Sequence, residues 1–226
     1  MSANFILVPD DWQPPLIAVI GMGMGKGDLS TKAIEWIKKA EVLAGGKRLL
    51  DMIQDHPGQK LYLGASLQDS LGRLNTISEA SRVAVLASGD PFFFGIGRRL
   101  VKYFGKERLL VSPNVTSVQT LFARLGESWD DAMVMSLHGR EDALVDRLLG
   151  LASSHSKVAV LTDPLHTPNW IAHRLLDAGI ENRYIVVAEN LGSPGEAIRR
   201  LSIREALAAD CSALNVVAIL APTATD

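Results

Sequence analysis

Short runs of Val, Ile and Leu alternate along the first half of the chain with segments whose apolar residues recur at helical spacing. The apolar runs lie at 16–20, 41–44, 60–63, 83–87 and 109–112. Most of them are apolar at consecutive positions, which is typical of strands covered by helices on both faces. Residues 31–40 and 97–104 predict helices between these strands. The apolar stripe predicted for the first helix consists of Ala33, Ile34, Ile37 and Ala40.

The second half repeats this alternation with a different sequence. The predicted strands lie at 132–137, 157–161, 184–188 and 215–220, and the predicted helices at 142–151 and 168–178. The fold class is therefore α/β. The most polar break is 124–132, and we place the domain boundary within 113–130, giving domains 1–114 and 115–226. Two α/β halves joined by one crossing segment predict a cleft between them, where small ligands commonly bind.

Composition and charge narrow the choice of partners. The 226 residues are 47% hydrophobic and 21% charged, with a formal net charge of −2. This balance predicts a globular protein that binds neither nucleic acid nor an anionic membrane surface. Cys211 is the only cysteine, which excludes an intramolecular disulfide, and its apolar setting indicates a small buried residue rather than a catalyst. Without a secretory signal or an apolar run of about 18 residues, we expect a cytoplasmic protein.

The glycine-rich segment GMGMGKGDLST, at 21–31, follows the first predicted strand. A glycine-rich turn before a helix commonly binds phosphate. However, Lys26 stands where a dinucleotide-binding loop needs its third glycine, and Gly27 stands where a nucleoside-triphosphate loop needs Ser or Thr. Two interpretations stay open: a tight turn with Asp28 or Ser30 capping the helix, or a loop that faces the substrate.

A second loop, ASGDPFFFGIG, follows the strand at 83–87. Gly89 allows its backbone to approach a ligand closely, Asp90 supplies a carboxylate at the carboxyl end of the strand, and Pro91 stiffens the turn. In open α/β sheets ligands bind at that edge. Gly-Asp-Pro is also a common turn, but the three rings of Phe92–Phe94 favour an apolar wall of a cleft.

Other loops place polar residues at strand and helix ends. Thr116 and Ser117 begin a helix, where we expect one hydroxyl to cap the helix and the other to hydrogen-bond a ligand. His138 and Arg140 follow a strand; Arg140 is suited to two-point contact with a carboxylate, whereas His138 is either structural or involved in substrate handling. Asp163 and Glu189 also follow strands, as turn residues or as site residues.

Several chemistries lack the residues that they need. The remaining histidines do not have metal-ligand spacing, so we predict no protein-bound metal. They are His56, His155, His166 and His173. No Gly-x-Ser-x-Gly motif appears, which argues against an acyl-enzyme hydrolase.

Taken together, these loops resemble those of the tetrapyrrole methylases. The matching segments are GMGMGKGDLST at 21–31, SGDPFFFGIGRRL at 88–100 and SPNVTSVQTLFARLGESWDDA at 112–132. SLHGR at 136–140 and LTDP followed by TP at 161–168 resemble the subgroup that methylates carbon 5 of a corrin precursor in cobalamin biosynthesis. Met24 stands where many relatives have proline, and Lys26 where many have aspartate.

The resemblance implies a two-domain fold, S-adenosylmethionine bound in the cleft between the domains, and a homodimer. The implied cofactor-binding residues are Gly89, Asp90, Pro91, Thr116, Ser117, Thr162 and Leu191. The implied contacts with the tetrapyrrole come from Met24, Lys26, Phe93, Arg98 and Arg140, with Arg99 as a further candidate. No residue is implied as a nucleophile, because methyl transfer from a sulfonium is a direct displacement that needs donor and acceptor held in line.

Three alternatives stay open at this point. One alternative is a protein of this fold that acts on another tetrapyrrole carbon, or on the modified histidine of elongation factor two, instead of on carbon 5. A non-catalytic tetrapyrrole carrier would use the same cleft. The chain is either a separate carbon-5 enzyme, with a carbon-15 methyltransferase and decarboxylase as a partner, or a fragment of a fused enzyme that carries both activities.

Overall fold

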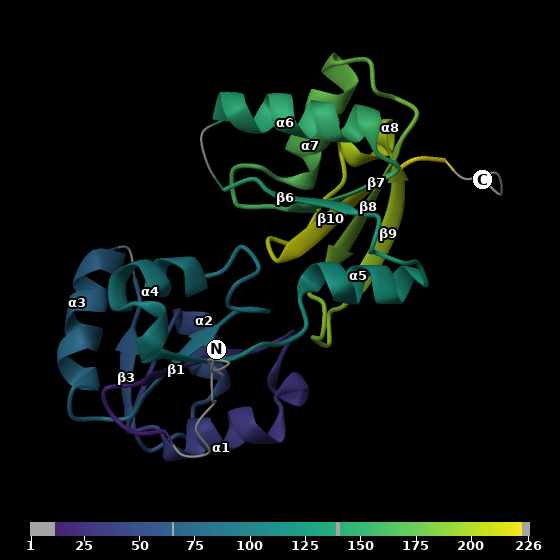
Figure 1. Ribbon diagram of the computed structural model, residues 1–226. Helices are drawn as coiled ribbons and strands as arrows, with labels where there is room; N and C mark the ends of the chain where they lie inside the picture. The colour runs from purple at the N-terminus through teal and green to yellow at the C-terminus, as the bar shows by residue number, and fades with distance from the viewer. Residues whose placement is uncertain (1–11, 65, 139–140, 223–226) are drawn as a thin grey trace, which may run out of the picture. The chain divides into compact units, whose positions relative to one another are not determined.

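The chain forms two compact α/β units, Met1–Thr116 and Ser117–Asp226. The computed structural model describes residues 12–64, 66–138 and 141–222 (Figure 1). The division lies close to position 114, where the sequence pattern places the end of the first domain. Each unit has its own sheet and its own core, and the cleft expected between the two halves stays a prediction.

The N-terminal unit is built on a five-stranded parallel sheet with the strand order β3-β2-β4-β1-β5. The strands are β1 (Ile17–Gly21), β2 (Val42–Gly45), β3 (Gln59–Tyr62), β4 (Val83–Ala87) and β5 (Leu109–Ser112). Every residue of β1, β2 and β4 is buried, which explains why these three segments are apolar at consecutive positions.

Helices cover both faces of this sheet. α1 (Thr31–Lys39) and α2 (Lys47–Met52) pack on the face that carries Ala18 and Ile20. α3 (Leu67–Ser78) and α4 (Gly97–Phe104) pack on the face that carries Ile17 and Val19. Alternate residues of β1 thus enter different cores, because successive side chains of a strand point to opposite faces. Two short 3-10 turns complete the unit, η1 (Lys26–Asp28) and η2 (Lys106–Arg108).

The two central connections leave the sheet in opposite directions. β1 leads to α1 on one face, whereas its neighbour β4 leads to α4 on the other. At such a switch point the two loops diverge and leave room for a ligand beside the carboxyl ends of the strands. The glycine-rich loop follows β1 and the Gly-Asp-Pro loop follows β4, so the topology brings these two loops together.

The C-terminal unit has a mixed sheet with the order β6-β7-β10-β8-β9. Its strands are β6 (Met133–Ser136), β7 (Lys157–Leu161), β8 (Tyr184–Glu189), β9 (Ala197–Ser202) and β10 (Asn215–Leu220). β6 and β7 are parallel, and β10 runs antiparallel between β7 and β8. The first residue of β10 therefore lies at the edge where β7 and β8 end.

Helices again cover both faces of this second sheet. α6 (Glu141–Ser154), α7 (Pro168–Asp177) and α8 (Ile203–Ala206) lie on one side and α5 (Ser117–Leu125) on the other (Figure 1). Leu148, Ile171 and Ile203 from the first group are buried in one core with Val217 of β10. Leu175 of α7 is also fully buried, as Ile171 is, so α7 packs on the sheet through residues one helical turn apart.

The structure departs from the predicted pattern at a few places. Ile34 is 38% exposed, so its assignment to the buried stripe of α1 is wrong, and Trp36 takes the core position instead. β9 was not predicted because it is an edge strand that carries Arg199 and Arg200. α2, α3 and α8 were also not predicted from their short or weakly apolar patterns.

Candidate functional site

The Gly-Asp-Pro loop and the glycine-rich loop are joined through their backbones. Gly23 and Gly89 exchange two hydrogen bonds, of 3.3 Å from Gly23 N to Gly89 O and 3.2 Å from Gly89 N to Gly23 O. Both glycines adopt the left-handed conformation, with φ of 58° and 57°. Residues that carry a side chain rarely adopt such φ values, so glycine is needed at both positions. Because Gly89 directly precedes Asp90, this backbone pairing fixes the position of Asp90 relative to the end of β4.

Asp90 closes its own turn and retains capacity to bind a ligand. Its Oδ1 accepts a 2.7 Å hydrogen bond from Phe92 N, and its Oδ2 accepts a 3.3 Å bond from Asn114 N. An ionised carboxylate has about four lone-pair positions, so about half of them stay open. The side chain is half-buried. Asp90 is therefore both the turn residue of one interpretation and a possible acceptor for hydroxyl or ammonium groups.

The three phenylalanines diverge, as their succession in the sequence requires. Phe92 and Phe94 are 51% and 52% exposed, whereas Phe93 is half-buried and meets Phe94 edge to face at 5.1 Å between ring centroids. Phe94 has a φ of 55°, an unusual value for a bulky residue. Strained backbone of this kind persists where surrounding structure enforces it, and it is concentrated at functional sites. The apolar wall expected here stays a prediction.

The glycine-rich loop is closed by its own aspartate. Asp28 Oδ2 accepts a 2.7 Å hydrogen bond from Met24 N, and Ser30 caps α1 by accepting a 3.1 Å bond from Ala33 N. The capping interpretation is thus confirmed for Ser30. Met24 is half-buried and Lys26 is exposed, so both side chains are at least partly accessible to a substrate. Their contacts with a substrate stay a prediction.

Asn114 connects all three loops at this edge of the sheet, a role that was not predicted from the sequence. Its Nδ2 donates to Gly21 O at 2.9 Å and to Asp28 O at 3.0 Å, while its Oδ1 accepts from Val115 N at 2.8 Å. Its backbone N–H binds Asp90. The only available signal was an asparagine directly after the β5 strand and Pro113. Asn114 therefore holds the glycine-rich loop and Asp90 in a fixed arrangement.

Asn114→Ala is expected to lower the free energy of unfolding by about 1–3 kcal/mol, because it removes two side-chain hydrogen bonds to carbonyls of the first loop. Amide hydrogen exchange should rise at residues 22–28 first. Asn75→Ala is the matched control, since Asn75 accepts a 3.1 Å bond from Arg108 on the other side of the sheet. Equal exchange rates in the glycine-rich loop of both variants would contradict the role given to Asn114.

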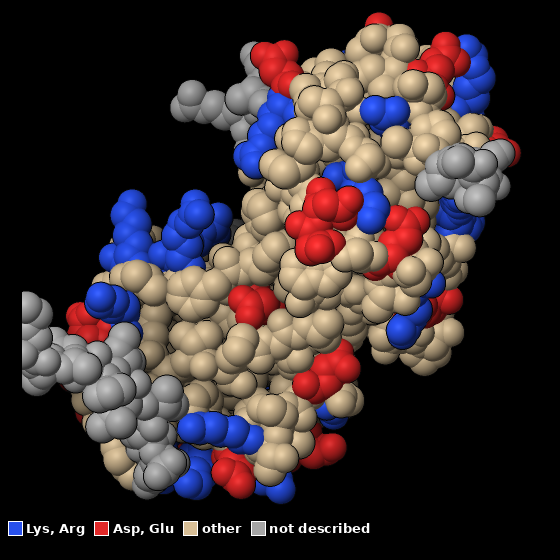
Figure 2. All heavy atoms as spheres, turned by 45° about the vertical axis from the view of Figure 1, so that its right-hand side comes forward, with Lys and Arg blue, Asp and Glu red and all other residues tan. Residues whose placement is uncertain are grey.

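Other predicted residues lie at the beginnings of helices α5 and α4. Thr116 is buried and directly precedes α5, which begins at Ser117. Pro91 is buried, and its carbonyl accepts a 2.8 Å bond from Gly97 N at the start of α4. α4 exposes Arg98 and Arg99. Figure 2 shows Lys and Arg side chains gathered on one part of the surface of the N-terminal unit, which is the charge that a polycarboxylate ligand requires.

In the C-terminal unit, Thr162 and Leu191 lie at the same edge of the sheet. Thr162 follows β7, and its Oγ1 donates to Asn215 at the start of β10, 2.8 Å from Oδ1 and 3.0 Å from the carbonyl oxygen. Leu191 follows β8 and is 7% exposed. β10 lies between the two strands, so the structure brings these two predicted residues to one edge of this sheet.

Asp163 acts as a turn residue, one of the two roles left open for it. Its Oδ1 accepts hydrogen bonds from the backbone of Leu165 at 2.9 Å and of His166 at 2.8 Å, and the ring Nδ1 of His166 lies 2.9 Å from Oδ2. Burial raises the pKa of Asp163, but the hydrogen bonds from His166 and Leu165 outweigh it and hold that pKa below its ordinary value. The ring of His166 packs edge to face on Trp170 at 4.7 Å.

This lowered pKa predicts a pH-dependent contribution to stability. Because the folded-state pKa lies below the unfolded value of about 3.9, the contribution of Asp163 is complete above that value and is lost as the pH falls through the folded pKa. In denaturant unfolding, Asp163→Asn should be less stable than the wild type at pH 6. The difference should shrink steadily below about pH 4. If the stability difference between the two proteins stays constant as the pH falls, the stabilising role given to the ionised Asp163 carboxylate is contradicted.

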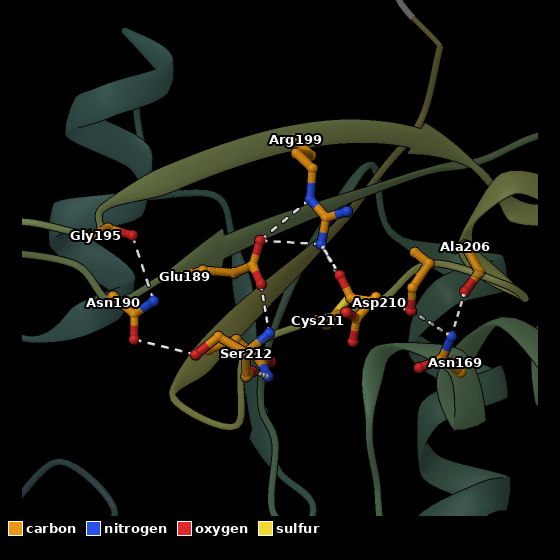
Figure 3. A network of polar contacts seen from close by, with 11 residues as sticks. Asn169, Glu189, Asn190, Gly195, Arg199, Ala206, Asp210, Cys211 and Ser212 are labelled. Atoms are coloured by element: carbon orange, nitrogen blue, oxygen red, sulfur yellow. Dashed lines mark hydrogen bonds and ion pairs between the residues drawn. The ribbon is translucent and has the colours of Figure 1, made fainter.

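Glu189 is buried in a polar network rather than exposed in a turn. Its side chain is held by Arg199, with 3.1 Å to Nε and 3.0 Å to Nη2, and by the backbone N–H of Ser212 at 2.5 Å (Figure 3). Cys211 lies beside the same arginine, with its Sγ 3.3 Å from Nη2. Burial raises the pKa of the Cys211 thiol, although Arg199 opposes that rise, which favours the uncharged thiol expected for a packing residue.

The remaining predicted residues are only partly described. His138 is exposed and its Nδ1 lies 2.9 Å from Ser136 Oγ. Arg140 lies outside the described residues, so its expected contact with a carboxylate stays a prediction.

Metal sites and membrane spans are both absent from the described part of the chain. Among those residues, His, Cys, Asp and Glu side chains nowhere gather in a group of three or more that could hold a metal ion. Likewise, across 12–64, 66–138 and 141–222, no helix has the length and apolar character to cross a membrane. The absence of a bound metal and the cytoplasmic location stay predictions.

Comparison with known proteins identifies a family. Residues 16–207 match the family described as Tetrapyrrole (Corrin/Porphyrin) Methylases. The chain is 36% identical over 206 residues to the cobalt-precorrin-7 C(5)-methyltransferase of Salmonella typhimurium, covering 91% of this chain and 98% of that protein. It is 32% identical to a probable cobalt-precorrin-7 C(5)-methyltransferase of Methanocaldococcus jannaschii, covering 89% and 96%. The crystal structure of the precorrin-6Y methylase of Archaeoglobus fulgidus has a similar fold, with a TM-score of 0.70, 24% identity, and coverage of 92% of this chain and 99% of that one.

Proposed function

The chain belongs to the tetrapyrrole (corrin/porphyrin) methylases, and we propose that it transfers a methyl group from S-adenosylmethionine to carbon 5 of a corrin precursor, cobalt-precorrin-7, in cobalamin biosynthesis. The observation that carries this proposal is the 36% identity to a cobalt-precorrin-7 C(5)-methyltransferase over 98% of that enzyme's length. Similarity over nearly the whole of a relative favours a shared substrate class, not only a shared fold.

The residues of the N-terminal unit fit the donor chemically. S-adenosylmethionine carries an ammonium group and ribose hydroxyls, which are donors, and supplies the methyl group on a sulfonium. Asp90 has open acceptor positions at the end of β4, beside the left-handed Gly89. We assign Gly89, Asp90 and Pro91 to cofactor binding in this unit. Thr116, Ser117, Thr162 and Leu191 complete the proposed set.

Catalysis in this proposal consists of positioning. The acceptor carbon of the macrocycle is itself nucleophilic, so the chain needs no covalent catalyst. Holding reacting atoms about 3–3.5 Å apart in line produces effective molarities of roughly 10⁵–10⁸ M. Asp90 orients the donor, while Phe93 and its neighbours exclude water. Met24, Lys26, Arg98 and Arg140 bind the tetrapyrrole, whose carboxylates suit guanidinium and ammonium partners.

The test is incubation with S-adenosylmethionine labelled in its methyl group and a panel of corrin precursors, with and without cobalt. We expect label at carbon 5 of the cobalt-containing substrate after multiple turnovers. Label at another carbon, or on elongation factor two, would replace the proposed acceptor. Binding of the macrocycle without any turnover would indicate a carrier instead of an enzyme.

A homodimer and a carbon-15 methyltransferase partner complete the proposal. Both are expected from the family resemblance. Light scattering of the purified protein tests the first, and copurification with a carbon-15 enzyme tests the second. A monomeric protein with full activity would show that dimerisation is not required for methyl transfer.

A further inference from the structure

The polar network around Glu189 occupies the edge of the C-terminal sheet that carries Thr162 and Leu191. β10 separates β7 from β8 in this sheet, and it is antiparallel to both. In its register Asn215 lies opposite Glu189, and Val216 lies opposite Leu161. The segment that leads into β10, 210–214, therefore lies between the carboxyl ends of β7 and β8 and can contact the turns after both strands.

Hydrogen bonds continue across this connection from one end to the other. Thr162 Oγ1 donates to Asn215, and Asn215 Nδ2 donates to Ser212 O at 2.7 Å. Ser212 Oγ then donates to Asn190 Oδ1 at 3.1 Å. Asn190 N in turn donates to Leu214 O at 2.9 Å. The two turns that hold Thr162 and Leu191 are thus tied to one intermediate segment.

Glu189 anchors that intermediate segment to the sheet. The residue is 7% exposed, and both of its carboxylate oxygens are engaged. Oε1 accepts from Ser212 N at 2.5 Å and Oε2 accepts from Arg199 Nε at 3.1 Å (Figure 3). Arg199 Nη2 also donates to Asp210 O at 2.6 Å, at the start of the same segment. A buried carboxylate with fixed partners on both oxygens has little freedom to move.

The turn after β8 is held by hydrogen bonds of Asn190. Asn190 has a φ of 50°, in the left-handed region, which asparagine adopts more readily than other residues with a side chain. Its backbone carbonyl accepts from Ser193 N at 2.9 Å, and its Nδ2 donates to Gly195 O at 3.3 Å. Leu191 follows directly and is buried, so the position of its side chain depends on this turn.

We propose that Glu189 is a positioning residue that, through Ser212 and Asn215, sets the separation between Thr162 and the Asn190–Leu191 turn. It does not contact the cofactor. This inference rests on the proposed function, in which Thr162 and Leu191 bind S-adenosylmethionine. Glu189 therefore controls affinity for that cofactor and leaves affinity for the tetrapyrrole unchanged.

The test compares variants at Glu189 with a control at the opposite edge of the same sheet. Glu189→Ala removes both anchors, whereas Glu189→Gln retains an oxygen that can accept from Ser212 N. Lys157→Ala, at the other end of β7, removes ion pairs with Asp131 at 3.1 Å and Glu127 at 3.6 Å. The measurements are calorimetric affinity for S-adenosylmethionine, KM for each substrate, kcat, and the midpoint of unfolding.

Glu189→Ala is expected to weaken S-adenosylmethionine binding by about tenfold or more, the loss that one charge-assisted hydrogen bond can produce. The KM for the corrin precursor should not change, and Glu189→Gln should recover most of the affinity. Lys157→Ala should lower the unfolding midpoint while its affinity stays that of the wild type. If Glu189→Ala binds S-adenosylmethionine as the wild type does, or if Lys157→Ala loses affinity equally, the inference is overturned.

A second variant covers the case in which Glu189→Ala does not fold. Ser212→Ala retains the backbone bond to Glu189 and removes only the bond to Asn190. We expect its affinity for S-adenosylmethionine to fall about two- to fivefold, in proportion to one neutral hydrogen bond. Unchanged affinity would overturn the inference. A wild-type protein that fails to bind S-adenosylmethionine would refute the proposed function itself, so the two failures are distinguishable.

Discussion

Replacing Asp90 with asparagine is expected to weaken S-adenosylmethionine binding by about 10- to 100-fold, while the protein stays folded. Hydrogen bonds to a charged group contribute about 1.5–3 kcal/mol, which corresponds to that range of affinity. The asparagine Oδ1 can still accept the 2.7 Å bond from Phe92 N that closes the turn. The change removes the negative charge and puts two donors where the ammonium or hydroxyl groups of the cofactor need acceptors.

Calorimetric titration with S-adenosylmethionine measures this effect directly. Asp69→Asn is the matched control, because Asp69 is an exposed carboxylate in the first turn of α3 that accepts a hydrogen bond from Ser66 Oγ. The control should bind the cofactor as the wild type does. If Asp90→Asn also retains wild-type affinity, Asp90 is only a turn residue, and its assignment to the cofactor site has to be abandoned.

Gly21→Ala is expected to abolish activity and to lower the free energy of unfolding by about 1–3 kcal/mol, the usual cost of overpacking. An added Cβ would lie 2.6 Å from Gly89 O, 2.9 Å from Asn114 Cβ and 3.0 Å from Pro91 Cδ. The nearest of these is a backbone atom that cannot rotate away. The methyl group would therefore separate the glycine-rich loop from the Gly-Asp-Pro loop at the point where they are paired.

Gly27→Ala in the same loop is the control for this prediction. An added Cβ at Gly27 would meet no atom within 4 Å, and its φ is not left-handed. We expect a change in stability within about 1 kcal/mol, with either sign, and cofactor affinity equal to that of the wild type. Methyl transfer assays and denaturant unfolding of both variants test the pair. Equal activity in Gly21→Ala and Gly27→Ala would show that the backbone pairing of the two loops is dispensable.

The fold could be predicted largely from the hydrophobic pattern. β4, β5, β7 and β10 begin and end where the pattern places them, because each consists mainly of consecutive apolar residues that stand out from the polar segments around them. β9 could not be predicted in this way. It is an edge strand that contains two arginines: Arg199 forms an ion pair with Glu189, and the guanidinium of Arg200 lies over the ring of Tyr184. Those partners are distant in the sequence, and only the pairing of strands supplies them.

The candidate site was predictable to a more limited extent. The Gly-Asp-Pro loop was found because a carboxylate at the end of a buried strand is a local signal. Asn114 carries no comparable signal, and Glu189, although it also lies at the end of a predicted strand, gives no indication in the sequence of its buried partners. Asn114 acts through bonds to Gly21 and Asp28, and Glu189 acts through Arg199 and Ser212. Each of these contacts joins segments that are separate in the sequence, so a pattern within one segment could not reveal it.

The sequence by itself determined the α/β class, most of the strands, the loops that carry glycine and carboxylate, and the family resemblance. These follow from local rules, since backbone periodicity and turn chemistry depend on residues that are near neighbours in the chain. Only the tertiary structure decided that β1 and β4 send their loops in opposite directions and that Gly23 pairs with Gly89. It also decided that Glu189 is buried against Arg199. Strand order and burial are properties of the packed chain, and they determine which of the candidate residues lie close enough to act together.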